Sequence, residues 1–487
     1  MTTPEMTTPE LGSDPIDEDR SLELSGEQLR ALVDAAMHRI SAYVDSLPEQ
    51  PASEVDGAAE MARSLVEPLP EIGQDYDELL ELLFEEVIPR GFGTAAPGYL
   101  AYIPGGGIPQ SAIGDLIAEM VNRYTSIWLP APGLAQIETV AIRWLCEMVE
   151  YPEDARGLLT TGGSMANFIG LVTARRERLP EDFLAGTIYV SDQAHHCVQK
   201  GAMLAGFPLG NVRMIPSDES FRMRLDVLEQ SIAEDREAGL TPFLVVGSGG
   251  TVNTGAVDDL VAIADIAERE RLWLHVDAAY GGFFVLTERG KRKLAGIERA
   301  DSIVLDPHKG LFLPYGTGSL LVRDGAALKR AHTVSAGYMP EMQTDPDFLD
   351  FAEMSPELSR DHRGLRVWLP IKMHGIEPFR RNLDEKLDLT LWATEQLRAI
   401  PGMEIVAEPE LSLVAFRLVK PEMGDDQLNR MNQEILEAVN ARKRVYLSGT
   451  LVNGVYLLRI CVLSFRTHQE DMERAVEDIR AAVDEIA

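Results

Sequence analysis

The chain has 487 residues, of which 45% are hydrophobic, and this length predicts two or three domains with a sizeable core. Its 45 Lys and Arg against 78 Asp and Glu give a net charge of −33, which argues against nucleic acid or an anionic membrane surface as a partner. Three scattered cysteines and the lack of any run of about 18 apolar residues predict a cytoplasmic protein without a membrane span.

The first part of the chain predicts a tail followed by helices. Residues 1–22 are acidic, repeat the sequence MTTPE and lack the basic and apolar regions of a signal peptide, so we expect a disordered tail. Residues 23–108 form a helical segment in which Ser25 is placed as a cap. This segment is too small for a core of its own and is expected to pack on a partner subunit. Gly105-Gly106-Gly107 near its end allows close approach to a ligand or serves as a flexible connector.

Apolar runs alternate with helical patterns in residues 109–376, which predicts a large α/β domain with a mostly parallel sheet. Ligands of such sheets bind beyond the carboxyl ends of the strands. Residues 377–487 mix helices with short strands and predict a small α+β domain. The runs predicted as strands of the large domain are Thr187–Val190, Phe243–Val246, Leu272–Val276, Ile303–Leu305 and Ser319–Val322, and the helical patterns between them are Ala166–Arg178, Leu225–Ala238 and Leu260–Arg269.

Small residues precede the first of these helices, in the sequence Thr160-Thr161-Gly162-Gly163-Ser164. Exposed backbone N–H groups and the partial positive charge of a helix N-terminus there would bind a phosphate. The alternative is an ordinary helix start with Ser164 as its cap.

Two histidines, His195 and His196, follow the run Thr187–Val190. Each can serve as a base, a ligand or a structural residue. A metal site is not predicted, because further ligands at a suitable spacing are lacking.

An acid, Asp277, ends the run Leu272–Val276. Such an acid can hold a ring nitrogen protonated, and the methyl of Ala279 can support a flat ring. The alternative is a buried aspartate bonded to loop amides. The next run ends at Asp306-Pro307, and His308 and Lys309 follow directly.

A phosphate-binding helix start, an acid, a histidine and a lysine at neighbouring strand ends form the set that pyridoxal phosphate requires. The lysine forms the Schiff base and the acid faces the pyridine nitrogen. Lys309 would usually reach solvent if taken alone, but with these neighbours it is predicted to be the Schiff-base residue.

The chain resembles the group II pyridoxal-phosphate-dependent amino-acid decarboxylases, which act on aromatic amino acids, histidine or glutamate. The motifs TGGSMAN (161–167), SDQAHH (191–196), HVDAAYGG (275–282) and DPHKG (306–310) occur in the family's order and spacing, and the likeness runs from about Tyr76 to the end. The resemblance implies fold type I: a large cofactor domain, a small α+β C-terminal domain and an N-terminal helical segment, assembled as a homodimer with shared active sites.

The resemblance also implies a role for each site residue. Lys309 would carry the cofactor as an internal aldimine, Asp277 would pair with the pyridinium nitrogen, and Tyr338 on a loop from the neighbouring subunit would reprotonate the quinonoid. The other implied contacts are Gly163, Ser164 and His308 at the phosphate, His195 (also catalytic) and Ala279 on the two ring faces, Thr251 near the cofactor, and Tyr102, Ile103 and Pro104 at the substrate.

Four positions depart from the family pattern. Val252 removes a hydroxyl near the cofactor, Gly310 replaces a tryptophan common in aromatic decarboxylases, and Ile103 and Thr94 replace aromatic residues of the substrate slot. These changes predict a wider or less aromatic slot.

The expected reaction is decarboxylation of an L-amino acid, foremost an aromatic one (Trp, Tyr, Phe or DOPA), to its amine and CO₂. The alternatives are a non-aromatic substrate such as glutamate, an aldehyde-forming oxidative decarboxylation, transamination, and a pyridoxal phosphate-binding protein without activity. Tyr338 and His195 favour plain decarboxylation over the aldehyde-forming variant, and the sequence DPHK argues against transamination.

Overall fold

The computed structural model describes residues 22–334, 345 and 347–486, and its internal contacts divide the chain after Ala96 into two compact units. As predicted, Ser25 caps the first helix, because its hydroxyl accepts from the backbone N–H of Gln28. That helix buries none of its side chains in the single chain. The first unit contains α1 (Gly26–Ser46), α2 (Ala58–Ser64), α3 (Tyr76–Glu81), a π-helical turn (Leu82–Val87) and the two-stranded ribbon of β1 (Ser53–Glu54) and β2 (Gly91–Phe92).

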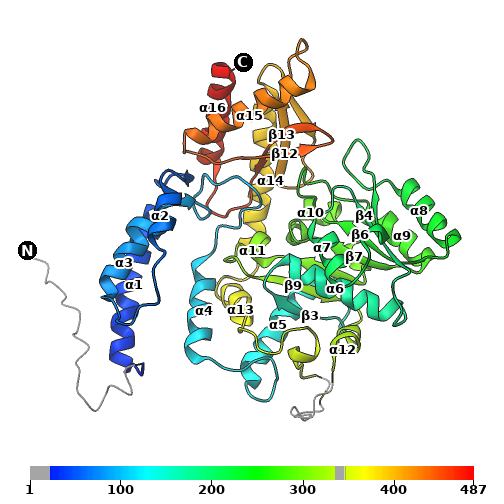
Figure 1. The fold of residues 1–487 in the computed structure, drawn as a ribbon, viewed down its shortest axis with the longest axis horizontal. Coiled ribbons are helices and arrows are strands. Elements are labelled where there is room, and N and C mark those ends of the chain that lie inside the picture. The colour runs from blue at the N-terminus through cyan, green and yellow to red at the C-terminus, as the bar shows by residue number, and fades with distance from the viewer. Residues whose placement is uncertain (1–21, 335–344, 346, 487) are drawn as a thin grey trace, which may run out of the picture. The chain divides into compact units, whose positions relative to one another are not determined.

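The second unit is built on a seven-stranded sheet in the order β3-β9-β8-β7-β6-β4-β5 (Figure 1). Only β9 is antiparallel to its neighbours β3 and β8, so the other strands of this sheet all run in one direction. The mostly parallel sheet predicted from the sequence is thereby confirmed. The strands are β3 (Arg156–Thr160), β4 (Gly186–Ser191), β5 (Val212–Ile215), β6 (Thr241–Ser248), β7 (Trp273–Asp277), β8 (Ser302–Leu305) and β9 (Gly318–Val322).

Helices cover this sheet, and its central strands are buried, as expected for a parallel sheet packed on both faces. Helix α6 contacts β3, β9, β8, β7 and β6, while α8 and α9 contact β6. The helices of this region are α4 (Pro109–Val121), α5 (Pro132–Met148), α6 (Gly163–Arg178), α7 (Cys197–Leu204), α8 (Leu225–Glu237), α9 (Leu260–Glu270), α10 (Glu288–Lys293), α11 (Pro307–Gly310), α12 (Ala326–His332) and α13 (Gly364–His374).

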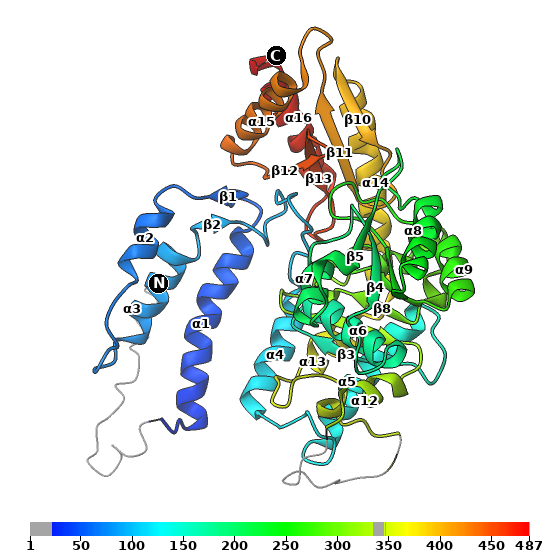
Figure 2. The same ribbon diagram turned by 45° about the vertical axis from the view of Figure 1, so that its right-hand side comes forward.

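The C-terminal part of the same unit has an antiparallel four-stranded sheet in the order β10-β11-β13-β12, with its own hydrophobic core (Figure 2). This mixture agrees with the predicted α+β region, although the boundary at residue 376 stays a prediction, because the second unit is continuous from Pro97. Its elements are α14 (Glu377–Arg398), β10 (Met403–Ala407), β11 (Leu413–Leu418), α15 (Asp425–Ala441), β12 (Ser448–Val452), β13 (Val455–Cys461) and α16 (Gln469–Ile486).

The strand directions decide where a ligand can bind. Because β3, β4, β6, β7 and β8 run parallel, their carboxyl ends meet at one edge of the sheet, where the loops that follow them converge. Within the described part of the chain, we find no helix with the length and apolar character needed to span a membrane.

Candidate active site

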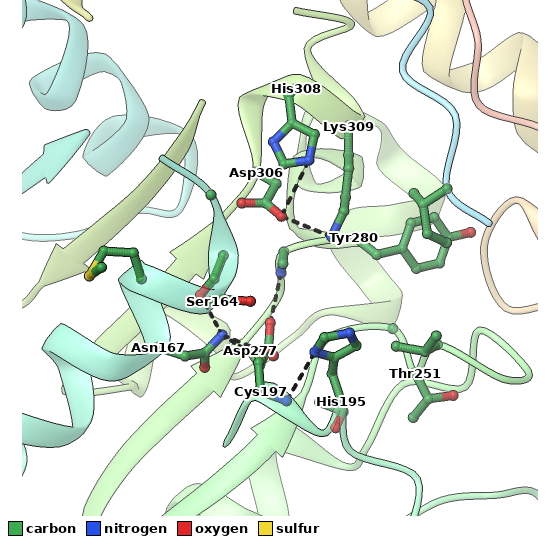
Figure 3. Close-up of a pocket in the computed structure, with 18 of the residues that line it drawn as sticks. Ser164, Asn167, His195, Cys197, Thr251, Asp277, Tyr280, Asp306, His308 and Lys309 are labelled. Atoms are coloured by element: carbon green, nitrogen blue, oxygen red, sulfur yellow. Dashed lines mark hydrogen bonds and ion pairs between the residues drawn. The ribbon is translucent and has the colours of Figure 1, made fainter. Parts of the chain in front are cut away.

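A cavity of about 310 Å³ lies at this edge of the sheet, within the range of roughly 300–1,000 Å³ typical of small-molecule sites. Side chains from the ends of five strands line it (Figure 3). The sequence-predicted residues that the structure brings together there are Ile103, Gly163, Ser164, His195, Thr251, Asp277, Ala279, His308 and Lys309.

Lys309 reaches this cavity from the short helix α11, which begins at Pro307. Its Nζ lies 2.8 Å from Oδ2 of Asp306, whose side chain is only 2% exposed. Burial opposes the charged ammonium, but the nearby carboxylates, that of Asp306 foremost and that of Asp277, raise the pKa of Lys309 on balance. The lysine is therefore held at a fixed place by a buried ion pair instead of reaching solvent from a loop.

Asp277, the last residue of β7, is the second acid of the cavity and is half-buried. Its Oδ1 accepts from the backbone N–H of Ala279 at 3.2 Å, and its Oδ2 accepts from Nδ2 of Asn167 at 3.2 Å. Burial raises its pKa, although the nearby charge of Lys309 acts in the opposite direction. No salt bridge to this carboxylate is found among the described residues, so a cation bound in the cavity would stabilise its charged form.

His195 follows β4 and is a neutral ring near pH 7. Burial lowers its pKa to about 4, and His196 and Lys309 add to this effect. Its Nδ1 accepts from the backbone N–H of Cys197 at 3.2 Å, so the ring proton is on Nε2. An uncharged, oriented imidazole suits packing against a flat ligand.

The predicted phosphate site lies between β3 and α6. Helix α6 begins at Gly163, after Gly162, and no side chain caps it, so the alternative that Ser164 is its cap is wrong. The first backbone N–H groups of α6 are thus left for a ligand. A Cβ on Gly163 would lie 3.0 Å from Oδ2 of Asp306 and 3.3 Å from Cβ of Ala279, so a side chain here would force these strand ends to shift.

His308 completes the group around this helix start. Its Nδ1 donates to the carbonyl of Thr317 at 2.7 Å, and its Nε2 makes no hydrogen bond within the described structure but lies 3.8 Å from Oδ2 of Asp306. Oδ1 of Asp306 is buried and has no hydrogen-bond partner within the described structure. The residues present fit pyridoxal phosphate. This cofactor requires a phosphate site, an acid for its ring nitrogen and a lysine for its aldehyde, and here these are the start of α6 with His308, Asp277 and Lys309.

Two of the described predicted residues, Tyr102 and Pro104, are not among those that line the cavity. Tyr338 lies outside the described residues. Tyr102 is 55% exposed, whereas the adjacent Ile103 lines the cavity and Pro104 is buried beside it in the chain. Gly105 lies against the backbone of His308, where a Cβ would approach the carbonyl oxygen to 1.9 Å. This glycine therefore serves close packing of its loop against α11, not a flexible connection.

Further residues line the cavity without having been predicted as site residues, among them Asp306, Asn167, Cys197, Met165, Ser248 and Tyr280. A signal existed for Asp306, since it ends a buried run directly before Pro307, the position at which Asp277 was recognised on the neighbouring strand. Asn167 belongs to the motif TGGSMAN, but its place one turn into a helix gives no local sign that it faces the sheet edge.

Comparison with known proteins is consistent with this geometry. The family model described as the pyridoxal-dependent decarboxylase conserved domain matches residues 59–419. The aromatic-L-amino-acid decarboxylase of Bacillus atrophaeus is 34% identical over 473 residues, which cover 96% of this chain and 98% of that protein. The enzyme of the same name from Catharanthus roseus is 27% identical over 490 residues, covering 98% and 97%.

Solved structures give the same result. The Oryza sativa TDC with PLP and tryptamine has a TM-score of 0.89 at 25% identity and covers 95% of this chain and 99% of that chain. Mouse CSAD has a TM-score of 0.86 at 26% identity, with coverage of 94% and 99%. These findings confirm the resemblance, the fold and the cofactor predicted from the sequence. The chain belongs to the family of pyridoxal-dependent decarboxylases.

Proposed function

We propose that this protein decarboxylates an aromatic L-amino acid to the corresponding amine and CO₂. The observation that carries the proposal is the meeting of Lys309, Asp306 and Asp277 in one buried cavity at the sheet edge. Pyridoxal phosphate, when bound, supplies an electron-accepting ring that stabilises the negative charge left by the departing carboxylate. An aromatic substrate is supported by the names of the relatives, which include tryptophan and tyrosine decarboxylases.

Each cavity residue has a proposed part. Lys309 would hold the cofactor covalently, and Asp306 fixes the lysine side chain beside the site. Asp277 keeps a proton on the ring nitrogen, because a buried carboxylate stabilises a cation next to it. The remaining proposed contacts are the phosphate with Gly163, Ser164 and His308, the ring with His195, Ala279 and Thr251, and the substrate with Tyr102, Ile103 and Pro104.

Two further residues, His195 and Tyr338, complete the proposal. His195 is neutral near pH 7 and can cover the ring without repelling its positive nitrogen. Tyr338, outside the described residues, is proposed as the group that returns a proton to the substrate carbon after CO₂ leaves. A tyrosine hydroxyl suits this step because it is protonated at neutral pH.

A substrate panel tests the reaction. Purified protein with added pyridoxal phosphate is expected to release CO₂ and the matching amine from at least one of L-tryptophan, L-tyrosine, L-phenylalanine and L-DOPA, as followed by mass spectrometry. L-Glutamate and L-cysteine sulfinate serve as non-aromatic comparisons. Turnover of only these two would contradict the aromatic assignment, and an aldehyde with ammonia in place of the amine would instead indicate the chemistry named for the Rhodiola rosea 4-hydroxyphenylacetaldehyde synthase.

We also propose a homodimer with shared active sites, with the domains divided as 23–108, 109–376 and 377–487. Helix α1 buries no side chain in the single chain, and Val66, Leu69 and Ile72 of the same unit are each more than 80% exposed. A partner subunit would cover such apolar surface. Light scattering should give about twice 53.7 kDa, and a mass that stays at 53.7 kDa across the micromolar range would contradict the dimer.

The three buried free cysteines support the proposed cytoplasmic location.

A further inference from the structure

Behind the cavity, a chain of hydrogen bonds runs from the sheet to Asp277. Nε1 of Trp273 lies 2.8 Å from Oγ of Ser302, and the same Oγ lies 2.7 Å from Nδ1 of His275. Nε2 of His275 lies 2.9 Å from Oδ1 of Asn167, and Nδ2 of Asn167 lies 3.2 Å from Oδ2 of Asp277. Figure 3 shows the last of these bonds, at the floor of the site.

The chemistry of the groups fixes the direction of each bond. An indole N–H can only donate, so the hydroxyl of Ser302 accepts from Trp273 and has its own proton for Nδ1 of His275. Burial lowers the pKa of His275 to about 4, so the ring is neutral and carries its single proton on Nε2. That proton goes to Oδ1 of Asn167, and the amide NH₂ must therefore face Asp277.

Asn167 uses its two amide protons on two parts of the site. Besides Asp277, its Nδ2 donates to the carbonyl of Gly163 at 2.9 Å, in the first turn of α6. If the amide turned over, its oxygen would face two acceptors, the carboxylate of Asp277 and the carbonyl of Gly163, which would cost both hydrogen bonds and add repulsion. His275 strengthens the observed orientation because it offers a donor to the amide oxygen.

Helix α6 makes room for this arrangement. Gly170 is one turn beyond Asn167, and a Cβ there would lie 2.8 Å from Cε1 and 3.2 Å from Nδ1 of His275. A larger residue would displace the imidazole from its two partners. Helix α6 thus supplies Asn167, which donates to Asp277, and Gly170, which leaves room for the His275 ring that orients Asn167.

We infer that His275 is a positioning residue that orients Asn167, so that Asn167 donates to Asp277 and keeps this acid charged and in place for the cofactor ring nitrogen. The inference rests on the proposed function, since the orientation matters to catalysis only if Asp277 serves the cofactor. His275 itself is not among the residues that line the cavity, so it acts on the site through Asn167.

The test compares His275→Gln, which retains an N–H donor, with His275→Leu, which has none. For each variant, apoprotein is titrated with pyridoxal phosphate to obtain the dissociation constant from absorbance, and kcat and KM are measured on the best substrate of the panel. We expect His275→Leu to lower kcat and weaken cofactor binding by roughly 10- to 100-fold, the loss found when hydrogen-bond partners behind metal ligands are removed. KM should change less than about threefold, and His275→Gln should stay within about threefold of wild type.

A double-mutant cycle identifies the path. If His275 acts through Asn167, then His275→Leu adds less than about threefold to the loss caused by Asn167→Ala. Two results would overturn the inference. The first is a double variant whose loss of cofactor affinity equals the product of the two single losses. The second is a His275→Gln variant as impaired as His275→Leu. Ser302→Ala provides a milder second variant, should His275→Leu fail to fold, and its loss of cofactor affinity must likewise disappear in the Asn167→Ala background.

The binding titration separates this inference from the proposed function. A wild-type protein that binds pyridoxal phosphate but releases no amine refutes the proposed reaction, while the cycle still tests the path through Asn167. A wild-type protein that does not bind the cofactor refutes both.

Discussion

Replacing Lys309 with alanine is expected to abolish amine formation, lowering kcat by roughly 10³-fold or more, as found when a covalent catalyst is removed. The same substitution should abolish the visible absorbance of the bound cofactor. Lys309 is the amine in the cavity, and Asp306 holds its Nζ at 2.8 Å. Rates come from mass spectrometric detection of the amine, and absorbance from the dialysed protein with added cofactor.

Lys200→Ala is the matched control, because Lys200 is an exposed lysine on the neighbouring helix α7. This variant should keep wild-type absorbance and turnover. Turnover by Lys309→Ala at more than about a tenth of the wild-type rate would contradict the assignment of the lysine.

Asp277→Asn should have the next largest effect and a different signature. The amide has nearly the shape of the carboxylate but lacks its charge, so the pKa of the cofactor ring nitrogen falls and the ring accepts electrons less well. We expect kcat to fall roughly 10²-fold or more, comparable to the loss of one preorganised electrostatic contact. Because Lys309 is intact, the covalently bound cofactor and its absorbance should remain. Steady-state kinetics and spectra of the same sample check both expectations.

Asp235→Asn controls for the general cost of changing a buried acid. Asp235 is 5% exposed and pairs with Arg213 and Tyr189, away from the cavity. Its loss should lower the melting temperature while kcat stays near wild type. An Asp277→Asn enzyme with kcat within about threefold of wild type would show that this carboxylate does not support the ring nitrogen.

Much of the site was predictable because its residues follow strand ends. His195, Asp277 and Lys309 each follow within a few residues of a predicted apolar run, and in a parallel sheet the ends of such runs meet at one edge. Local pattern and one general rule of sheet topology are sufficient to bring them together.

The remaining features of the site depend on contacts between residues far apart in the chain, which give no signal in the local sequence. The exposure of Tyr102 and the inward position of Ile103 follow from the path of their loop, which is fixed where Leu100 bonds to the backbone of Tyr446 and Cys461, more than 340 residues away. The direction of Asn167 is likewise set by His275 on another element. Such long-range constraints cannot be read from spacing along the chain.

The strands that the sequence did not predict have a similar explanation. β3 (Arg156–Thr160) has only a short apolar stretch, and β5 (Val212–Ile215) contains an arginine and lies at the sheet edge, so neither shows an apolar run in the sequence. β9 runs antiparallel to β3 and β8, and apolar periodicity along the chain does not encode the direction of a strand in its sheet.

The central claim is that Lys309 carries the cofactor in the cavity at the sheet edge. It is tested most directly by reducing the wild-type protein with borohydride in the presence of pyridoxal phosphate, followed by proteolysis and peptide mass spectrometry. Our account predicts one stoichiometric pyridoxyl modification, on the peptide that contains Lys309. Stoichiometric modification of another lysine with Lys309 unmodified, or no modification at saturating cofactor, would contradict it.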